Sequence, residues 1–384
     1  MPLDALRRPP GLCSCCPAPG KPLTVEYAAE RVRAAWNTSS PGLFRFAAGL
    51  PVTGLAPSYA DDVGGTPVML DERLSAELEG PVFIKNEAVN PSGSFKDRGL
   101  AMGIALGVAF GAQRFCLPTQ GNAGVAAALF CSRLGSAPAI VYMPEGYQGS
   151  IYHRACRHFG GEVVFAGANI AGAGQAMRAA LAEPLARGEY VDISTFFEPG
   201  RLEGKKTMGF EIAEAFAGRA LPDAIFYPTG GGTGLVGIWK ALKELATWGL
   251  ADAAHARLPR LFAVQSSRCA PVVAAFDAGA AEVAPVVSQG TRADGLDVPG
   301  AIMGHSMLSA LRESGGAALA LEEDQIERAF RDLGRRGIGA GYESAATLAA
   351  LRAARQTGAL GAGTSALLLL TGSHLIPLAR EGAS

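Results

Sequence analysis

Short apolar runs that lead into a glycine-rich loop and then into a helical pattern recur along this chain from Pro67 onward. The sequence predicts strands over 83–84, 115–117, 139–143, 163–165, 224–227, 261–265 and 366–370. It predicts helices over 25–36, 95–109, from Gly124 to Leu134, and over 235–245. Alternating strands and helices favour parallel sheets that are covered by helices on both faces. Ligands bind such sheets at the carboxyl ends of the strands, so functional residues are expected in the loops there.

Composition narrows the class of protein. The length of 384 residues and the hydrophobic content of 49% are enough for about two domains. The net charge of −1 gives no electrostatic field that would attract nucleic acid or a membrane. The longest weakly polar stretch, 100–112, is too short to span a bilayer, and Met1–Pro10 lacks the apolar core of a secretory signal. Four cysteines stand singly in apolar segments, which indicates reduced, buried thiols and a cytoplasmic protein: Cys116, Cys131, Cys156 and Cys269.

Lys96 is the strongest candidate for a catalytic group. It lies in the stretch Asn90-Pro91-Ser92-Gly93-Ser94-Phe95-Lys96-Asp97-Arg98-Gly99, in which a turn is followed by a helix. In the first helical turn the positive end of the helix dipole disfavours the charged form of the amine. An uncharged lysine amine is what a Schiff base with an aldehyde requires.

A second candidate is the glycine run Tyr227-Pro228-Thr229-Gly230-Gly231-Gly232-Thr233-Gly234, between a strand and a helix. Successive glycines let backbone N–H groups converge on a phosphate at the helix N-terminus. The same run fits the dinucleotide pattern G-x-G-x-x-G, but the next strand ends in Gln265-Ser266-Ser267 without the acidic residue that this pattern needs. Dinucleotide binding and a purely structural turn remain the lesser alternatives.

Two more loops follow predicted strands. Thr119-Gln120-Gly121-Asn122-Ala123-Gly124 offers donors for a carboxylate and an amide for a phenolate oxygen. Thr371-Gly372-Ser373 offers a hydroxyl that could lie against a ring nitrogen. Each loop alone is more typical of an ordinary turn. The two loops indicate a functional site only in combination with Lys96 and the glycine run.

Taken together, these loops resemble those of threonine synthase, a fold-type II enzyme that depends on pyridoxal 5′-phosphate (PLP). The similarity runs from Gly42 to the C-terminus and includes Gly64–Pro67, Glu198–Thr207, Ala270-Pro271, Ser314–Gly316 and Glu343–Ala346. The lysine and glycine motifs are shared by the wider superfamily. Asp97 and the run Arg201-Leu202-Glu203-Gly204-Lys205-Lys206-Thr207 point more narrowly to threonine synthase.

The resemblance implies an α/β fold with two open, twisted parallel-sheet domains and the cofactor in the cleft between them. The expected domains are an N-terminal arm over 1–60, a large PLP-binding domain from 61–100 and 204–384, and a smaller α/β domain over 101–203. Fold-type II enzymes are often dimers, so a homodimer is expected.

The resemblance also implies roles for single residues. Lys96 would form the Schiff base with PLP, and Phe95 would lie beside the ring. Asn122 would contact the 3′-oxygen, and Thr371 would face the pyridine nitrogen. The PLP phosphate would be held by Gly230, Gly231, Gly232 and Thr233.

For the substrate, the resemblance implies conversion of O-phospho-L-homoserine and water to L-threonine and phosphate. Thr119 would help to bind the substrate carboxylate and Arg201 the substrate phosphate, since its planar guanidinium matches phosphate oxygens. A solvated or paired surface arginine is the alternative for Arg201.

Three departures from the family pattern keep other reactions open: Thr119-Gln120 for Ser-Ser, Tyr342-Glu343-Ser344 for Pro-Glu-Gly, and Gly200 where an aromatic residue is frequent. The alternatives are a related PLP β- or γ-replacement enzyme, such as a cysteate synthase or an enzyme of secondary metabolism, and a threonine or serine dehydratase. A non-catalytic PLP-binding protein is disfavoured by the intact Lys96 and Asn122.

The remaining motifs favour structural roles. Cys13-x-x-Cys16 is half of a zinc motif, and no second cysteine pair follows, so no metal is expected. His153 and His158 are five residues apart, on different helix faces. Glu322-Glu323-Asp324 is typical of a helix start.

Overall fold

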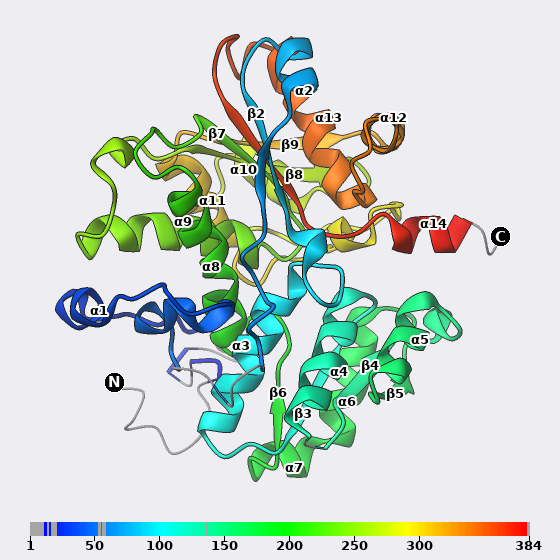
Figure 1. The fold of residues 1–384 in the computed structure, drawn as a ribbon. Helices are drawn as coiled ribbons and strands as arrows, with labels where there is room; N and C mark the ends of the chain where they lie inside the picture. The colour runs from blue at the N-terminus through cyan, green and yellow to red at the C-terminus, as the bar shows by residue number, and fades with distance from the viewer. Residues whose placement is uncertain are drawn as a thin grey trace. The chain divides into compact units, whose positions relative to one another are not determined.

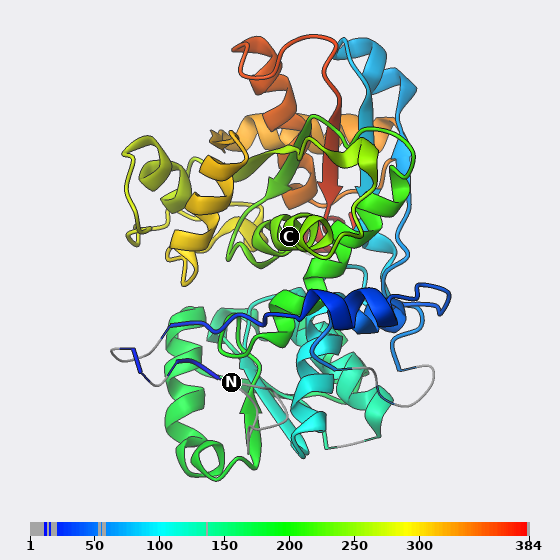
Figure 2. The same cartoon turned by 90° about the vertical axis from the view of Figure 1, so that its left-hand side faces the viewer.

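The computed structural model describes residues 11–13, 15–16, 21–52, 55, 59–135 and 137–381. These residues form two compact units. The first contains the described residues up to Gly65 together with Lys96–Thr207, and the second contains Thr66–Phe95 and the described residues from Met208 onward. Figure 1 shows the two units with labels on many of their helices and strands, and Figure 2 gives a second view.

The first unit is built on a four-stranded parallel sheet in the order β5-β4-β3-β6. Helices alternate with these strands along the chain, as the sequence predicts. Its elements are α1 (Ala29–Ala35), η2 (Leu43–Gly49), α3 (Lys96–Ala109), β3 (Arg114–Pro118), α4 (Asn122–Leu134), β4 (Ile140–Met143), η4 (Glu145–Tyr147), α5 (Ile151–His158), β5 (Glu162–Phe165), α6 (Ile170–Ala180), α7 (Ala182–Ala186), β6 (Tyr190–Asp192) and the first half of α8 (Gly200–Ala215).

The second unit is built on a six-stranded sheet in the order β1-β2-β10-β7-β8-β9, in which only β1 runs antiparallel to its neighbour. Its other elements are β1 (Val68–Leu70), α2 (Glu72–Glu77), β2 (Val82–Asn86), η3 (Glu87–Val89), β7 (Ala224–Pro228), α9 (Thr233–Thr247), η5 (Ala253–His255), β8 (Arg260–Ser266), α10 (Pro271–Asp277), η6 (Asp294–Leu296), α11 (Gly304–Glu313), β9 (Ala317–Leu321), α12 (Glu323–Arg335), α13 (Tyr342–Gln356), β10 (Ala366–Leu370) and α14 (Leu375–Glu381).

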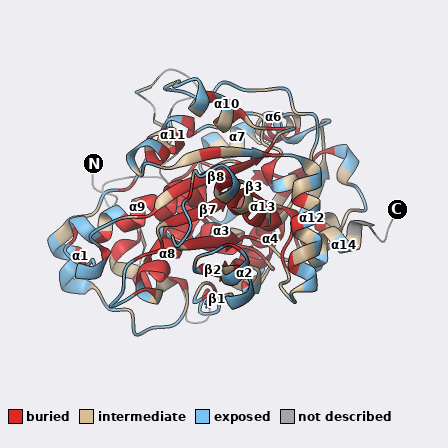
Figure 3. Ribbon diagram, turned by 90° about the horizontal axis from the view of Figure 1, so that it is seen from above, coloured by how far each residue is buried: buried red, intermediate tan, exposed pale blue. Residues whose placement is uncertain are grey.

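The central strands of the second unit are continuous runs of apolar residues because they lie in its core. Every residue of β7 and β10 is buried, because both faces of the sheet are covered by helices. Figure 3 shows this burial along the central strands of the molecule. The apolar faces of α12 and α13 pack on one side of the sheet, and the links β7–α9–β8 and β8–α10–α11–β9 place their helices on the other.

The predicted fold class, α/β with parallel sheets, is confirmed, and the predicted strands and helices are present with bounds shifted by a few residues. The helix expected over 25–36 is shorter, since α1 begins at Ala29. The division into an arm and two domains at residues 60, 100 and 203 stays a prediction. The prediction that no secretory signal is present depends on residues 1–10, which lie outside the described ranges. Within those ranges, no helix has the length and apolar character to cross a bilayer.

The four cysteines predicted to be buried thiols are confirmed as free and buried: Cys116, Cys131, Cys156 and Cys269. Burial raises the pKa of Cys131 and Cys156 to about 12 and that of Cys269 to about 11, so their thiols stay protonated near neutral pH. The charged start of α12 is also confirmed, as Glu322 and Gln325 form a capping box.

Candidate active site

The turn that precedes Lys96 is hydrogen-bonded to the segment that follows β10. The backbone N–H of Phe95 donates to the carbonyl oxygen of Thr371 at 3.1 Å, and the N–H of Ser373 donates to Gly93 O at 3.1 Å. Between them, Ser94 and Gly372 form an antiparallel bridge. Phe95 and Thr371, two of the predicted cofactor residues, therefore lie together, and Lys96 is the next residue along the chain.

Phe95 also connects this turn to the glycine run. Its ring meets the ring of Tyr227 edge to face, with centroids 6.2 Å apart. Tyr227 lies near the end of β7 and is the first residue of the glycine run, and β7 pairs with β10. The predicted residues of the second unit therefore gather at the carboxyl ends of two neighbouring parallel strands, where ligand sites of such sheets are found.

The glycine run has a backbone that other residues could not adopt. Gly232 precedes α9 with a φ of +79°, a left-handed conformation that favours glycine. A Cβ atom at Gly232 would overlap the Met307 sulfur, and one at Gly230 would overlap Gly295 O. The run thus presents bare backbone at the N-terminus of a 15-residue helix, an arrangement that fits a phosphate group.

Ser344 supports Thr371 from the start of α13. Its Oγ accepts the N–H of Thr371 at 2.9 Å and that of Gly372 at 3.4 Å, and its side chain is fully buried. The neighbouring Glu343 accepts the N–H of Gly295 at 2.8 Å. In the sequence, Ser344 belongs to one of the three departures from the family pattern. Nothing in the sequence indicates that its hydroxyl holds the loop after β10.

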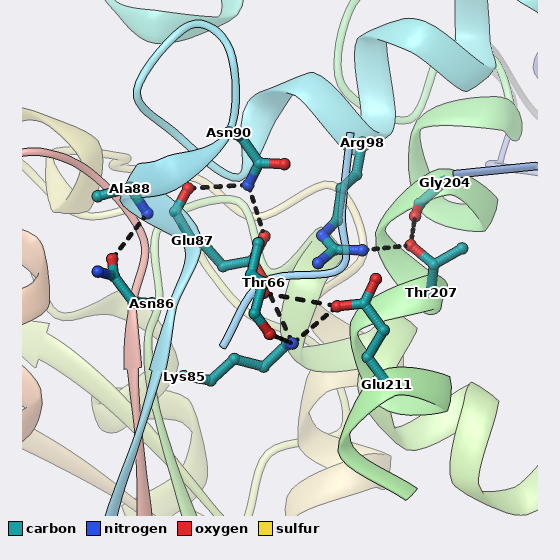
Figure 4. Close-up of polar contacts among 10 residues, drawn as sticks. All are labelled: Thr66, Lys85, Asn86, Glu87, Ala88, Asn90, Arg98, Gly204, Thr207 and Glu211. Carbon is teal, nitrogen blue, oxygen red and sulfur yellow. Dashed lines mark hydrogen bonds and ion pairs between the residues drawn. The ribbon is translucent and has the colours of Figure 1, made fainter. Parts of the chain in front are cut away.

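A buried polar network that no sequence motif indicates lies behind the same turn (Figure 4). Lys85, on β2, forms an ion pair with Glu211 at 2.8 Å and lies 3.7 Å from Glu87. Glu87 accepts a hydrogen bond from Asn90 Nδ2 at 3.0 Å and one from the Thr66 hydroxyl at 2.6 Å. Because Asn90 O in turn accepts the N–H of Gly93 at 2.7 Å, the network fixes the turn that leads to Lys96.

In the first unit, Lys96 is the first residue of α3, so it lies in the first helical turn as the sequence predicts. Its side chain is half-buried. α3 packs against α4, whose first residue is Asn122. The Oδ1 atom of Asn122 is buried and has no hydrogen-bond partner among the described residues. A buried amide without its full set of partners is costly unless a ligand satisfies it, so Asn122 fits a polar cofactor atom.

Thr119 lies in the same loop, at the end of β3, and is 4% exposed. Its Oγ1 accepts the N–H of Gly121 at 3.1 Å, which tightens the turn before Asn122. Its backbone N–H donates to Tyr142 O at 2.9 Å and continues the pairing of β3 with β4. Thr119 thus has a clear structural role, and its predicted contact with a substrate carboxylate stays a prediction.

Arg201 is the second residue of α8 and is 3% exposed, so the alternative of a solvated surface arginine is wrong. Its Nη1 donates to Ile193 O at 2.9 Å, whereas its Nε is buried with no hydrogen-bond partner in the described part of the chain. Ile193 directly follows β6, the strand beside β3. Arg201 is therefore fixed at the same edge of the sheet as Thr119 and Asn122.

Glu198 adds a buried carboxylate beside Arg201. Its oxygens accept the N–H groups of Gly200 at 2.5 Å and of Arg201 at 3.0 Å, at the start of α8. Burial raises the pKa of Glu198 to about 7, although Arg201 and these N–H groups oppose the shift. Burial also lowers the pKa of Arg201 to about 10, with Glu198 opposing.

The other polar motifs do not join this site. Cys13, Cys15 and Cys16 are free thiols, and no group of three or more His, Cys, Asp or Glu side chains within the described ranges could hold a metal ion. His153 and His158 both lie on α5, where His153 is half-buried and His158 exposed.

The chain is similar to known proteins over most of its length. Residues 59–372 match the family described as "Pyridoxal-phosphate dependent enzyme". A protein named threonine synthase from Methanosarcina acetivorans is 30% identical over 88% of this chain and 81% of its own length. One of the same name from Methanocaldococcus jannaschii is 28% identical over 87% and 80%.

Solved structures share the fold. Maize serine racemase has a TM-score of 0.66 and 19% identity, and covers 83% of this chain and 93% of its own. The processed form of threonine deaminase isoform 2 from Solanum lycopersicum has a TM-score of 0.69 and 22% identity, over 94% and 97%. At these identities the likeness concerns the fold alone.

Proposed function

Because this chain belongs to the pyridoxal-phosphate dependent enzymes, we propose that it is a threonine synthase, which converts O-phospho-L-homoserine and water to L-threonine and phosphate. The observation that carries the proposal is the similarity to proteins of that name in archaea and bacteria, at 28–30% identity over 81–88% of this chain. The threonine deaminase and serine racemase structures support the fold and do not favour either of those reactions.

We further propose which residues hold PLP. Lys96 would bond to the aldehyde carbon, and Phe95 would lie beside the ring. Asn122, with its buried Oδ1, would pair with the 3′-oxygen, and Thr371 would face the ring nitrogen. The phosphate would lie against Gly230, Gly231, Gly232 and Thr233. The left-handed Gly232 and the helix that follows it support this fit.

When bound, PLP supplies an electron sink for negative charge at the substrate's α carbon. The chain's own residues supply the rest. The Lys96 amine, once released by the incoming amino acid, would take the proton from that carbon and return it later. The hydroxyl of Thr371 carries no charge, so it would leave the ring nitrogen unprotonated. That moderates the sink and favours elimination and replacement over transamination.

The substrate would be held by the first unit. We propose that Thr119 contributes to carboxylate binding and that Arg201 contributes to phosphate binding, because a buried guanidinium is a strong partner for a phosphate dianion. A charged Glu198 beside Arg201 would repel the phosphate dianion unless the carboxylate stays paired or is protonated. Binding of the substrate phosphate would therefore depend on pH.

The test is release of inorganic phosphate from O-phospho-L-homoserine by the purified holoenzyme, with L-threonine identified as the product. Lys96→Ala should release no phosphate, and borohydride reduction should attach PLP to Lys96 of the wild type alone. Formation of 2-oxobutyrate from L-threonine, or use of O-phosphoserine with sulfite, would instead indicate a dehydratase or a cysteate synthase. A reduced adduct on another lysine would overturn the site assignment.

We also propose a cytoplasmic location, supported by the four buried free thiols, which reducing compartments preserve. The expected partner is a small amino-acid phosphate. The homodimer expected from the resemblance stays a prediction that light scattering on the purified protein would test.

A further inference from the structure

Arg201 and Lys205 form a buried pair of cations on α8. They are four residues apart, so they lie on the same face of the helix. Arg201 is 3% exposed and Lys205 is fully buried. Lysine is rarely buried in this way without a specific role, because its charged form loses solvation.

This face of α8 is turned toward the residues that follow Lys96 on α3. A Cβ atom at Gly99 would lie 3.0 Å from Lys205 Cε and 3.0 Å from Arg201 O. Gly99 is three residues from Lys96 and shares its helix face. One turn further along, a Cβ at Gly103 would lie 2.8 Å from Glu198 Oε1. The Lys96 face of α3 therefore packs directly on Arg201, Lys205 and Glu198.

The electrostatics agree with this packing. Burial lowers the pKa of Lys205 well below its usual value, and the charges of Lys96 and Arg201 lower it further, while Glu198 opposes them. Three cationic groups thus repel one another in a region of low dielectric constant. An anion placed beside them would stabilise their charged forms. The buried Nε of Arg201, which has no partner in the described part of the chain, also points to a ligand that accepts hydrogen bonds.

Lys206, the next residue, provides a contrast. It is also fully buried, but it forms an ion pair with Glu203 at 2.7 Å and lies 4.1 Å from the centre of the Tyr27 ring. Its charge is therefore stabilised by its own neighbours, one of which comes from the N-terminal segment. For Lys205, by contrast, the charges of Lys96 and Arg201 lower the pKa.

We propose that Lys205 is a specificity-determining positioning residue, which acts through Arg201 and Lys96 to favour a substrate that carries a phosphate or similar anionic group. It would strengthen anion binding through its charge without touching the reacting atoms. The inference deepens the proposed function and rests on it for the identity of the anion as the substrate's phosphate.

The experiment measures the affinity of the holoenzyme for inorganic phosphate by isothermal titration calorimetry, with PLP already in place. Lys205→Met should weaken phosphate binding by roughly tenfold or more, since it removes a charge close to the anion. Lys205→Arg should retain most of the affinity. Lys206→Met is the matched control: it should unfold at a lower temperature, because the buried Glu203 carboxylate loses the cation of its ion pair, and should bind phosphate like the wild type.

Thermal unfolding separates this role from a structural one. Lys205→Met should still unfold in one cooperative transition, so that a loss of phosphate affinity in the folded variant reports on binding and not on the fold. Should Lys205→Met fail to fold, the side chain is structural and the proposal is overturned. Equal phosphate affinity in the wild type and Lys205→Met would overturn it too, as would a wild-type holoenzyme that binds no phosphate.

The proposed reaction can fail independently. If phosphohomoserine is not turned over, yet the wild type binds phosphate and Lys205→Met does not, the substrate is wrong and the role of Lys205 stands. If phosphohomoserine is turned over with the same KM by the wild type and Lys205→Met, the reaction stands and the role of Lys205 is wrong.

Discussion

The backbone N–H of Phe95 donates a hydrogen bond of 3.1 Å to the carbonyl oxygen of Thr371, although 276 positions separate the two residues in the sequence. The bond joins the turn that leads to Lys96 to the end of the central strand β10. Because Lys96 is the next residue, the position of its backbone is determined by the attachment to the sheet and not by the helix that begins at Lys96. The attachment of this turn to the sheet should therefore govern cofactor binding as well as stability.

Ser344→Ala tests that attachment. The change removes the buried acceptor of the Thr371 N–H and leaves that donor unsatisfied, so we expect a loss of about 1–3 kcal/mol in the free energy of unfolding. PLP should also dissociate more readily. Urea denaturation and an absorbance titration with PLP measure the two effects. Ser309→Ala is the control, since its hydroxyl bonds in an exposed pair with Glu313. Stability equal to that of the wild type would contradict the role of Ser344.

Gly232→Ala tests the proposed phosphate site. The change places a side chain on a residue with left-handed backbone geometry, and the new Cβ would overlap Met307. Both stability and PLP affinity should therefore fall. Gly358→Ala is the matched control, because Gly358 also has a positive φ, +73°, but open space around its Cβ. Its cost should be limited to backbone strain of about 1–2 kcal/mol, with PLP binding unchanged. Normal PLP affinity in Gly232→Ala would argue against the assigned phosphate site.

The sequence predicted the loops of this site because each one follows an apolar run and contains glycine, proline or asparagine. Those features determine local backbone geometry, and parallel strands then bring the loops to one edge of each sheet. The beginning of α3 at Lys96 and of α4 at Asn122 could be predicted in this way, to within one or two residues.

The parts that the sequence did not predict depend on contacts between distant residues. β9 is Ala-Ala-Leu-Ala-Leu, a composition that does not favour strands, and it forms one because it pairs with β8. β6 has only three residues and no distinctive pattern. The ion pair of Lys85 with Glu211 spans 126 positions, so no local spacing could have revealed it.

Lys85→Met should be severely destabilising. It leaves two buried carboxylates, Glu87 and Glu211, without their shared cation, so we expect a cost of about 3–5 kcal/mol. Replacing Lys85 and Glu211 together by apolar residues should cost less than the sum of the single changes, and urea denaturation of the double-mutant cycle measures the difference. The exposed pair of Lys243 and Glu313 is the comparison, where Lys243→Met should cost about 0–1 kcal/mol. Additive effects of the Lys85 and Glu211 changes would show that the two side chains do not interact.

The buried Glu198 should make stability depend on pH in a direction opposite to that of an ordinary paired carboxylate. Burial raises the pKa of Glu198 from 4.5 to about 7, so between these values the unfolded chain gives up the proton while the folded chain keeps it. The unfolded state then binds fewer protons, and this contribution to stability falls as pH rises from about 4.5 to about 7. It is fully present below 4.5 and stays lost above 7.

Glu198→Gln removes this titration and keeps one of the two oxygens that accept N–H groups at the start of α8. The difference in unfolding free energy, wild type minus variant, should therefore decrease steadily across that pH range and level off on either side. Chemical denaturation of both proteins at several pH values from 4 to 8 measures it. A difference that rises with pH would mean that Arg201 and the backbone N–H groups lower the pKa of Glu198 more than burial raises it, and that Arg201 is already neutralised by a carboxylate at neutral pH. Arg201 would then have to exchange one anion for another to bind a phosphate.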